Sequence, residues 1–171
     1  MKDPAVVALR DQLAAEIAEA INNLGEARID TGIRLGRDAS AATTLASGGL
    51  SSRFSLDALI NYCAPVGLEV KIVLTGLNEG KPEERADRGR TIPSEPDHSA
   101  SGLLRKQLIK AVAHQINTAG LGRNELAART GIPATTLSAL RAENIQRFRV
   151  DKLIEFAIKL GLNIKLDVEH A

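Results

Sequence analysis

Residues 123–141, RNELAARTGIPATTLSALR, decide the fold of this 171-residue chain. Apolar residues recur at helical spacing on both sides of Gly131, and a glycine suits a tight turn there because it adopts left-handed backbone conformations without strain. Ile132 is expected to fill the core beneath the turn. Pro133 suits the start of the second helix, where the N–H that proline lacks would have no helical partner. The stretch predicts two short helices joined by a tight turn.

The second of these helices is expected to present an outer face to a ligand. Leu137 and Leu140 are spaced to turn inward, toward a core. Five residues are left on or beside the outer face as candidates for reading base edges: Ala134, Thr135, Ser138, Ala139 and Arg141. A helix presented in this way fits the major groove of DNA, with its N-terminal residues against the bases. The pattern therefore predicts a helix-turn-helix that binds double-stranded DNA.

The stretch belongs to a segment that occurs twice along the chain. An offset of 95 residues aligns Arg28 with Arg123, Gly36 with Gly131 and Leu45 with Leu140. After one inserted residue near Gly48-Gly49, an offset of 94 aligns Arg53-Phe54 with Arg147-Phe148 and Gly67-Leu68 with Gly161-Leu162. A register held over this length with one insertion predicts a tandem duplication.

Each segment closes with alternating apolar and polar residues, which predicts a half-buried strand. The apolar residues expected to serve in pairing are Val70, Ile72 and Leu74 in the first segment and Ile164, Leu166 and Val168 in the second. A lone strand leaves its backbone N–H and C=O groups unsatisfied, so the two strands are expected to pair, either within one chain or across a dimer. We favour a homodimer through the C-terminal strand.

The domain organisation follows from these segments. Residues 1–75 are expected to form a first, degenerate helix-turn-helix domain and residues 101–171 a basic, DNA-binding one. Residues 76–100, with proline, glycine and charge but no apolar periodicity, are typical of a flexible linker. The predicted fold class is mainly α: two tandem helix-turn-helix domains, each closing with a short β-strand used for pairing.

Charge is distributed unevenly along the chain. The net formal charge is +1, but residues 101–171 carry 11 Lys or Arg against 6 Asp or Glu, whereas residues 1–75 carry 7 against 9. A basic excess confined to one small domain is typical of a domain that binds a polyanionic ligand. The charge therefore favours the second domain as the one that contacts DNA.

The motifs in both segments resemble a known family. In residues 126–140, Leu-Ala-x-x-x-Gly-Ile followed by Thr-x-Leu-Ser-x-Leu is similar to the lambda-repressor-like (XRE) helix-turn-helix. Arg147-Phe148-Arg149-Val150-Asp151 with Gly161-Leu162, and the matching residues from Arg53 and from Gly67, resemble the HigA-type antitoxin branch. The resemblance implies a four- or five-helix fold, dimeric operator binding, and often autorepression of a toxin–antitoxin operon.

The resemblance also implies which residues lie near phosphates in the second domain: Arg123, Thr136, Asn144, Gln146 and Arg147, with Arg149 beside them. Arg123 begins the first helix of the motif, where backbone amides also favour a phosphate. On the reading helix, Ala and Thr contact a thymine methyl group. We therefore expect modest sequence specificity, or reading of DNA shape.

The first segment is a weaker reader by the same criteria. Thr31-Gly32 stand where the second segment has Leu126-Ala127, which predicts poor packing and a weakened first helix. Arg37-Asp38 replace Ile132-Pro133, so the apolar plug is missing and an acid lies where phosphates would bind. Weaker DNA contacts are expected from Arg28, Ser40, Thr43, Thr44 and Arg53. The alternative is a first segment that remains a fully working reader.

Several other functions are not indicated. The three histidines have no metal-ligand spacing and no phosphate-binding glycine loop is present, so we expect no enzyme, no cofactor and no metal. Cys63 is expected to be a small buried residue. The absence of a signal peptide and of a long apolar run predicts a cytoplasmic protein without a membrane segment.

Two classes of function remain. The leading one is a sequence-specific DNA-binding repressor, acting as a homodimer and resembling an autoregulating antitoxin. The alternative is a protein-interaction module, such as an antitoxin that sequesters a toxin protein, in which DNA reading is reduced or lost. Neither the operator nor any effector can be inferred from the sequence.

Overall fold

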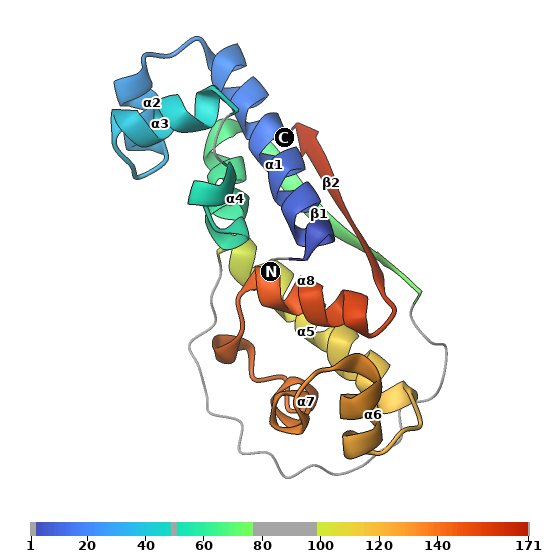
Figure 1. Ribbon diagram of the computed structural model, residues 1–171. Coiled ribbons are helices and arrows are strands. Elements are labelled where there is room, and N and C mark those ends of the chain that lie inside the picture. Colours follow the sequence, from blue (N-terminus) through green and yellow to red (C-terminus); the bar gives the residue numbers. More distant parts are fainter. Residues whose placement is uncertain (1–2, 49–50, 77–98, 171) are drawn as a thin grey trace. The chain divides into compact units, whose positions relative to one another are not determined.

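The computed structural model describes residues 3–48, 51–76 and 99–170, and the structural statements below concern these residues (Figure 1). The predicted linker, residues 76–100, lies almost entirely outside them. The chain is mainly helical, with one small sheet of two strands. Within the described ranges, no helix combines the length and the apolar character needed to cross a membrane.

Both halves of the chain have the same order of α-helices and strands, and the first half has an additional short 3-10 helix, η2. The first half comprises α1 (Pro4–Leu24), α2 (Arg28–Arg34), α3 (Ala39–Ala46), η1 (Ser51–Arg53), α4 (Leu56–Cys63), η2 (Ala64–Val66) and β1 (Leu68–Thr75). The second half comprises α5 (Ala100–Thr118), α6 (Arg123–Thr130), α7 (Ala134–Arg141), η3 (Ile145–Arg147), α8 (Val150–Lys159) and β2 (Asn163–His170). The helices and strands predicted from apolar periodicity are all present.

The described residues form two compact units, and each unit contains residues from both halves. The first unit comprises residues 3–48, 51–72, 99–101 and the chain from Leu166 onward. In it α1 packs against α3 and α4, and side chains such as Ile17 and Leu59 are fully buried between them. Leu166, which is 1% exposed, belongs to this unit although it comes from the other end of the sequence.

The second unit comprises residues 73–76 and 102–165 among those described. Its core is formed by α5, α7 and α8, with Leu108, Leu140 and Leu153 fully buried. The Gln115 side chain donates a hydrogen bond of 3.3 Å to the Leu160 carbonyl oxygen, which ties α5 to the end of α8. Leu160 and Gly161 end α8, and Gly161 takes the left-handed φ of +86°.

The two strands pair with each other within the chain. Lys71 of β1 forms an ion pair with Glu169 of β2, with 2.5 Å between Nζ and Oε2. At the other end of the ladder, Gly76 lies against the Gly161 carbonyl, so the strands run antiparallel. Intrachain pairing is one of the two arrangements that the sequence left open. The favoured pairing of like strands across a dimer is not the one found, because β1 already supplies hydrogen-bonding partners for β2.

The six predicted pairing residues lie where the alternation placed them. Ile72 and Leu166 are buried, and the remaining four are half-buried: Val70, Leu74, Ile164 and Val168. Cys63 is also buried, as expected, at 1% exposure. Burial raises the pKa of its thiol to about 12, with a further contribution from the charge of Glu16, so the thiol is protonated and unreactive at neutral pH.

Zero-length carbodiimide cross-linking tests the strand pairing without any substitution. We expect an amide bond between Lys71 and Glu169, because their charged atoms are in direct contact. Mixing ¹⁴N- and ¹⁵N-labelled protein before coupling distinguishes the two arrangements by mass spectrometry. Cross-linked peptides of unmixed isotope content are the expected result, and mixed peptides would show that the strands pair between chains.

Candidate nucleic-acid interface

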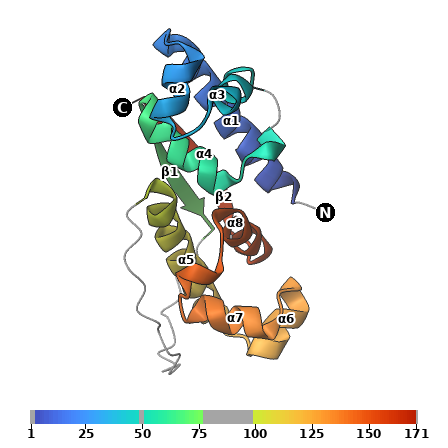
Figure 2. The same ribbon diagram turned by 90° about the vertical axis from the view of Figure 1, so that its left-hand side faces the viewer.

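The second half contains two short helices joined by a tight turn. Gly131 ends α6 with a left-handed φ of +68°, the conformation for which glycine was expected. Ile132 is 1% exposed and Leu126 is 3% exposed, so the turn and α6 are both anchored in the core. Figure 1 and Figure 2 show α6 and α7 side by side at one end of this unit. Leu137 and Leu140 are also buried, so one face of α7 packs into the core.

The outer face of α7 carries small side chains. Thr135 is exposed, and Ala134 and Ser138 are half-buried. Ala139 was expected on or beside this face, but its side chain is only 9% exposed. After α7, the Asn144 backbone amide donates to the Ala139 carbonyl oxygen at 3.1 Å. A buried alanine side chain is poorly placed to contact a base edge.

Arg141 is the last residue of α7 and lies partly under the surface. Its side chain is half-buried, and its Nε is shielded from solvent with no hydrogen-bond partner among the described residues. Arg141 therefore lies beside the outer face rather than on it. The residues that remain directly available for contact with base edges are Ala134, Thr135 and Ser138.

Arg123 and Ser138 come together on the surface of the second unit. Arg123 is the first residue of α6, and its Nη1 donates a hydrogen bond of 3.1 Å to the Ser138 hydroxyl. The same hydroxyl donates to the Ala134 carbonyl oxygen at 3.2 Å. The contact holds an exposed guanidinium against the outer side of α7. A residue expected near a phosphate thus lies next to one expected near a base.

The N-termini of the two equivalent helices α3 and α7 differ in how they are capped. The cap of α7 is Pro133, which provides no side-chain hydrogen bond, so first-turn amides of α7 remain available to an anion. The cap of α3 is Asp38, and its carboxylate accepts a hydrogen bond of 2.7 Å from the Ala41 amide. A carboxylate therefore already occupies the place on α3 where a phosphate would bind.

The loop after α7 directs two arginines into solvent. The Phe148 ring packs edge-on against Phe156, with ring centroids 5.8 Å apart. Arg147 and Arg149 flank this anchored ring, and both are exposed. Neither has an acidic side chain within ion-pair distance among the described residues. The other predicted phosphate contacts differ in exposure: Gln146 is exposed, whereas Thr136 and Asn144 are half-buried.

The equivalent polar residues of the first half bond within their own half. Arg28, the counterpart of Arg123, donates a hydrogen bond of 2.8 Å to the Asn22 side chain. The hydroxyls of Thr43 and Thr44 donate to carbonyl oxygens one turn earlier on α3. Ser40 and Arg53 are exposed. The residues that the sequence predicted as weaker contacts are thus partly engaged before any ligand arrives.

The first half lacks the apolar plug, as predicted, but its α2 is well packed. Arg37 stands in place of Ile132 and is exposed, with its guanidinium 5.8 Å from the Tyr62 ring centre. The expected poor packing of Thr31-Gly32 is wrong. Thr31 is fully buried, and its hydroxyl donates to the Ala27 carbonyl oxygen. A Cβ on Gly32 would lie 2.9 Å from backbone atoms of the turn, so glycine is required for close packing there.

Two acids that the sequence analysis overlooked lie among the candidate contacts. Glu125 is exposed in the first turn of α6, and Glu143 is exposed just after α7. Glu143 also has a left-handed φ of +51°. A residue-by-residue charge count of 123–149 would have shown both. They subtract from the positive potential that the arginines provide.

Comparison with known proteins agrees with this geometry. Residues 94–169 match the model of a helix-turn-helix domain. The second half contains a helix-turn-helix domain. Helix-turn-helix domains place their second helix in the major groove, so the match indicates DNA binding. The match covers one domain and does not extend to the first half. No curated protein and no solved structure matches the chain.

Substituting Arg123 and its counterpart separately tests which half contacts DNA. We expect Arg123→Gln in the full chain to weaken duplex binding by about tenfold, because a charge-assisted hydrogen bond to phosphate is lost. The salt dependence of log K should become shallower by about 0.9. Arg28→Gln is the matched control and should change neither quantity. Equal losses from the two variants in a fluorescence anisotropy titration would contradict the assignment.

Proposed function

We propose that this chain is a sequence-specific, double-stranded DNA-binding transcriptional repressor that acts by binding rather than by catalysis. The observation that carries the proposal is the uncapped N-terminus of α7 beside exposed Arg123, Arg147 and Arg149. These groups supply backbone amides and positive charge where a helix-turn-helix meets phosphates. The basic excess of residues 101–171 supports the same assignment.

We also propose that the two halves arose by tandem duplication in the lambda-repressor-like family, close to HigA-type antitoxins. The sequence register and the repeated order of elements support this. The edge-on aromatic pair supports it further, because Phe54 and Tyr62 in the first half repeat the geometry of Phe148 and Phe156. On this proposal the first half has lost phosphate binding through Asp38 and serves assembly instead.

Selection from random duplex DNA with the full chain tests the repressor function. We expect enrichment of a short motif, with an affinity that falls steeply as salt rises, since each neutralised phosphate contributes a slope of about −0.9. A palindrome would indicate a symmetric dimer, with half-sites about one helical turn apart. No enrichment, together with binding that does not weaken between low and physiological salt, would contradict the proposal.

Assembly through α2 is the second part of the proposal. Ile29 and Ile33 lie one turn apart on α2 and are 66% and 73% exposed, whereas the aligned residues of the second half are Asn124 and Ala128. A shallow groove lined by Glu26, Asp30, Ile33 and Arg34 runs beside this ridge.

A second copy of the chain fits this surface. In a two-fold contact the isoleucine ridge of each α2 would enter the groove of the other, as in ridges-into-grooves helix packing. The groove carries both acidic and basic side chains, which an antiparallel approach would bring opposite one another. We therefore place the homodimer contact at α2 rather than at the C-terminal strand.

The variant Ile29→Asn/Ile33→Ala, which copies the residues of the second half, tests this dimer. We expect the wild-type chain to sediment as a dimer and the variant as a monomer with an unchanged circular dichroism spectrum. Leu103→Ala, which removes an exposed aliphatic side chain outside α2, is the control and should leave the dimer intact. A wild-type monomer at about 100 μM, a concentration at which weak dimers still form, would contradict the assignment.

The exposed isoleucine ridge also favours the alternative function, a module that binds another protein such as a toxin. A monomeric wild-type chain that selects no DNA, but co-purifies in fixed stoichiometry with a co-expressed toxin through Ile29 and Ile33, would favour this alternative over the repressor. Dimerisation and operator selection would favour the repressor.

A further inference from the structure

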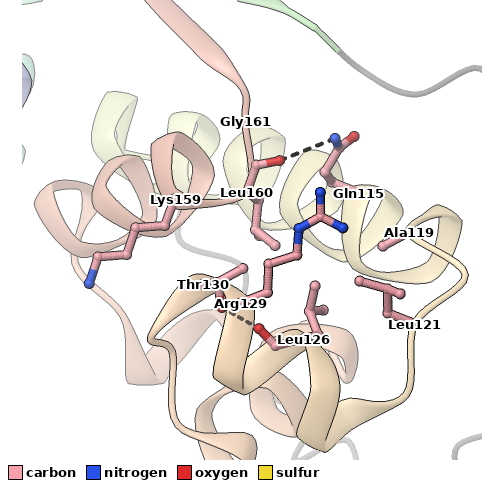
Figure 3. Close-up of a pocket in the computed structure, with 9 residues that line it drawn as sticks. All are labelled: Gln115, Ala119, Leu121, Leu126, Arg129, Thr130, Lys159, Leu160 and Gly161. Carbon is pink, nitrogen blue, oxygen red and sulfur yellow. Dashed lines mark hydrogen bonds between the residues drawn. The ribbon is translucent and has the colours of Figure 1, made fainter.

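The second unit contains a cavity of about 370 Å³, lined by residues of α5, α6 and the end of α8 (Figure 3). Three leucines give it an apolar side: Leu121 before α6, Leu126 within α6 and Leu160 at the end of α8. The remaining lining includes Gln115 of α5 and Ala119 just after it, and Arg129 and Thr130 from the last turn of α6. The volume lies within the range of small-molecule sites.

At two positions that line the cavity, the second half has smaller residues than the first half has at the aligned positions. Ala119 stands where the first half has Leu24, and Thr130 stands where it has Leu35. In the first half Leu35 is buried at 7% exposure, whereas Leu24 is 36% exposed. The Thr130 hydroxyl donates to the Leu126 carbonyl oxygen at 2.7 Å, so it turns back onto α6.

Arg129 brings an unpaired positive charge to this cavity. Figure 3 shows its side chain rising from α6 into the space between Leu160 and Gln115, whereas Lys159 points away. Lys159 forms an ion pair with Glu155 at 3.4 Å. No hydrogen bond or ion pair within the described ranges engages the Arg129 side chain.

The aligned arginine of the first half has a carboxylate partner that Arg129 lacks. Its counterpart Arg34 binds both carboxylate oxygens of Glu26 through Nε and Nη2. The register places Leu121 where Glu26 stands. The guanidinium has therefore lost its carboxylate in the second half, and an apolar side chain lines the cavity in its place.

We propose that this cavity binds a small monocarboxylate with a short aliphatic chain, whose carboxylate takes the role that Glu26 has in the first half. A guanidinium binds a carboxylate through two parallel N–H···O bonds, which fixes both position and orientation. The aliphatic chain lies along Leu121, Leu126 and Leu160. Such a ligand joins α6 to the end of α8 and so acts on the helix that carries Arg123. The proposal does not depend on DNA binding.

Titration of the ¹⁵N-labelled full chain with butanoate, followed by NMR, tests the site. We expect saturable shifts confined to the amides around the cavity, Arg129, Thr130 and Gly161 among them. Butanamide, which has the same shape without the charge, should bind at least about tenfold more weakly, because the charge-assisted bonds are absent. No saturable shift with butanoate, or equal binding of the two compounds, overturns the proposal.

Three variants locate the binding group. Arg129→Gln should weaken butanoate binding by about tenfold, whereas Arg34→Gln, the matched substitution in the first half, should leave it unchanged. Leu121→Glu restores the acid of the first half and should block butanoate by occupying Arg129, with a spectrum that remains well dispersed. If Arg129 serves only to offset the carbonyl ends of α6 and α8, Arg129→Gln will lower the melting temperature without changing butanoate binding, which also overturns the proposal.

Discussion

The antiparallel pairing of β1 with β2 is the interaction on which the rest of the structure depends. Each half supplies a single strand, which alone would leave its backbone N–H and C=O groups without partners, and the strand of the other half supplies them. The ladder also divides between the two units, so that Leu166 completes the core of the first unit and residues 73–76 belong to the second. Burial of one leucine contributes about 2 kcal/mol. Each half of the sequence therefore needs the other to complete its unit.

The two halves, which share their order of α-helices and strands, differ at the pair of short helices that each contains, α2 and α3 in the first half and α6 and α7 in the second. Asp38 caps α3 with its own carboxylate, whereas Pro133 leaves the first turn of α7 uncapped. Arg28 is half-buried and bonds Asn22, whereas Arg123 is exposed and bonds Ser138. Both arginines are therefore engaged within the chain, and they differ in exposure. The clearest difference between α3 and α7 is the cap, a carboxylate on α3 and a proline on α7.

Periodicity in the sequence was sufficient to predict the elements, because each helix and strand buries one regular face. Periodicity was less informative where a contact depends on residues that are distant in the sequence. Ala139 is only 9% exposed, although the α7 pattern placed it on or beside the outer face. Gly32 was expected to weaken α2, but it permits close packing against the turn, a contact invisible to helix propensity. The pairing of strands within one chain depends on a ladder joining residues almost a hundred positions apart. The exposed Ile29 and Ile33 were detectable, since alignment with Asn124 and Ala128 marks them as unusual for a solvated helix face.

The chemistry of α7 limits how its outer face can distinguish one DNA sequence from another. With Ala139 covered, the face presents a methyl group and two hydroxyls, and the Ser138 hydroxyl already bonds Ala134 and Arg123. None of these groups makes the bidentate contacts that identify guanine or adenine in the major groove. On the proposed function, discrimination would come from thymine methyl contacts and from the shape and stiffness of the duplex under Arg123, Arg147 and Arg149. The proposed α2 dimer would add a fixed spacing between two such faces. The first half would then contribute to specificity through assembly, although Asp38 places a carboxylate at the start of its α3.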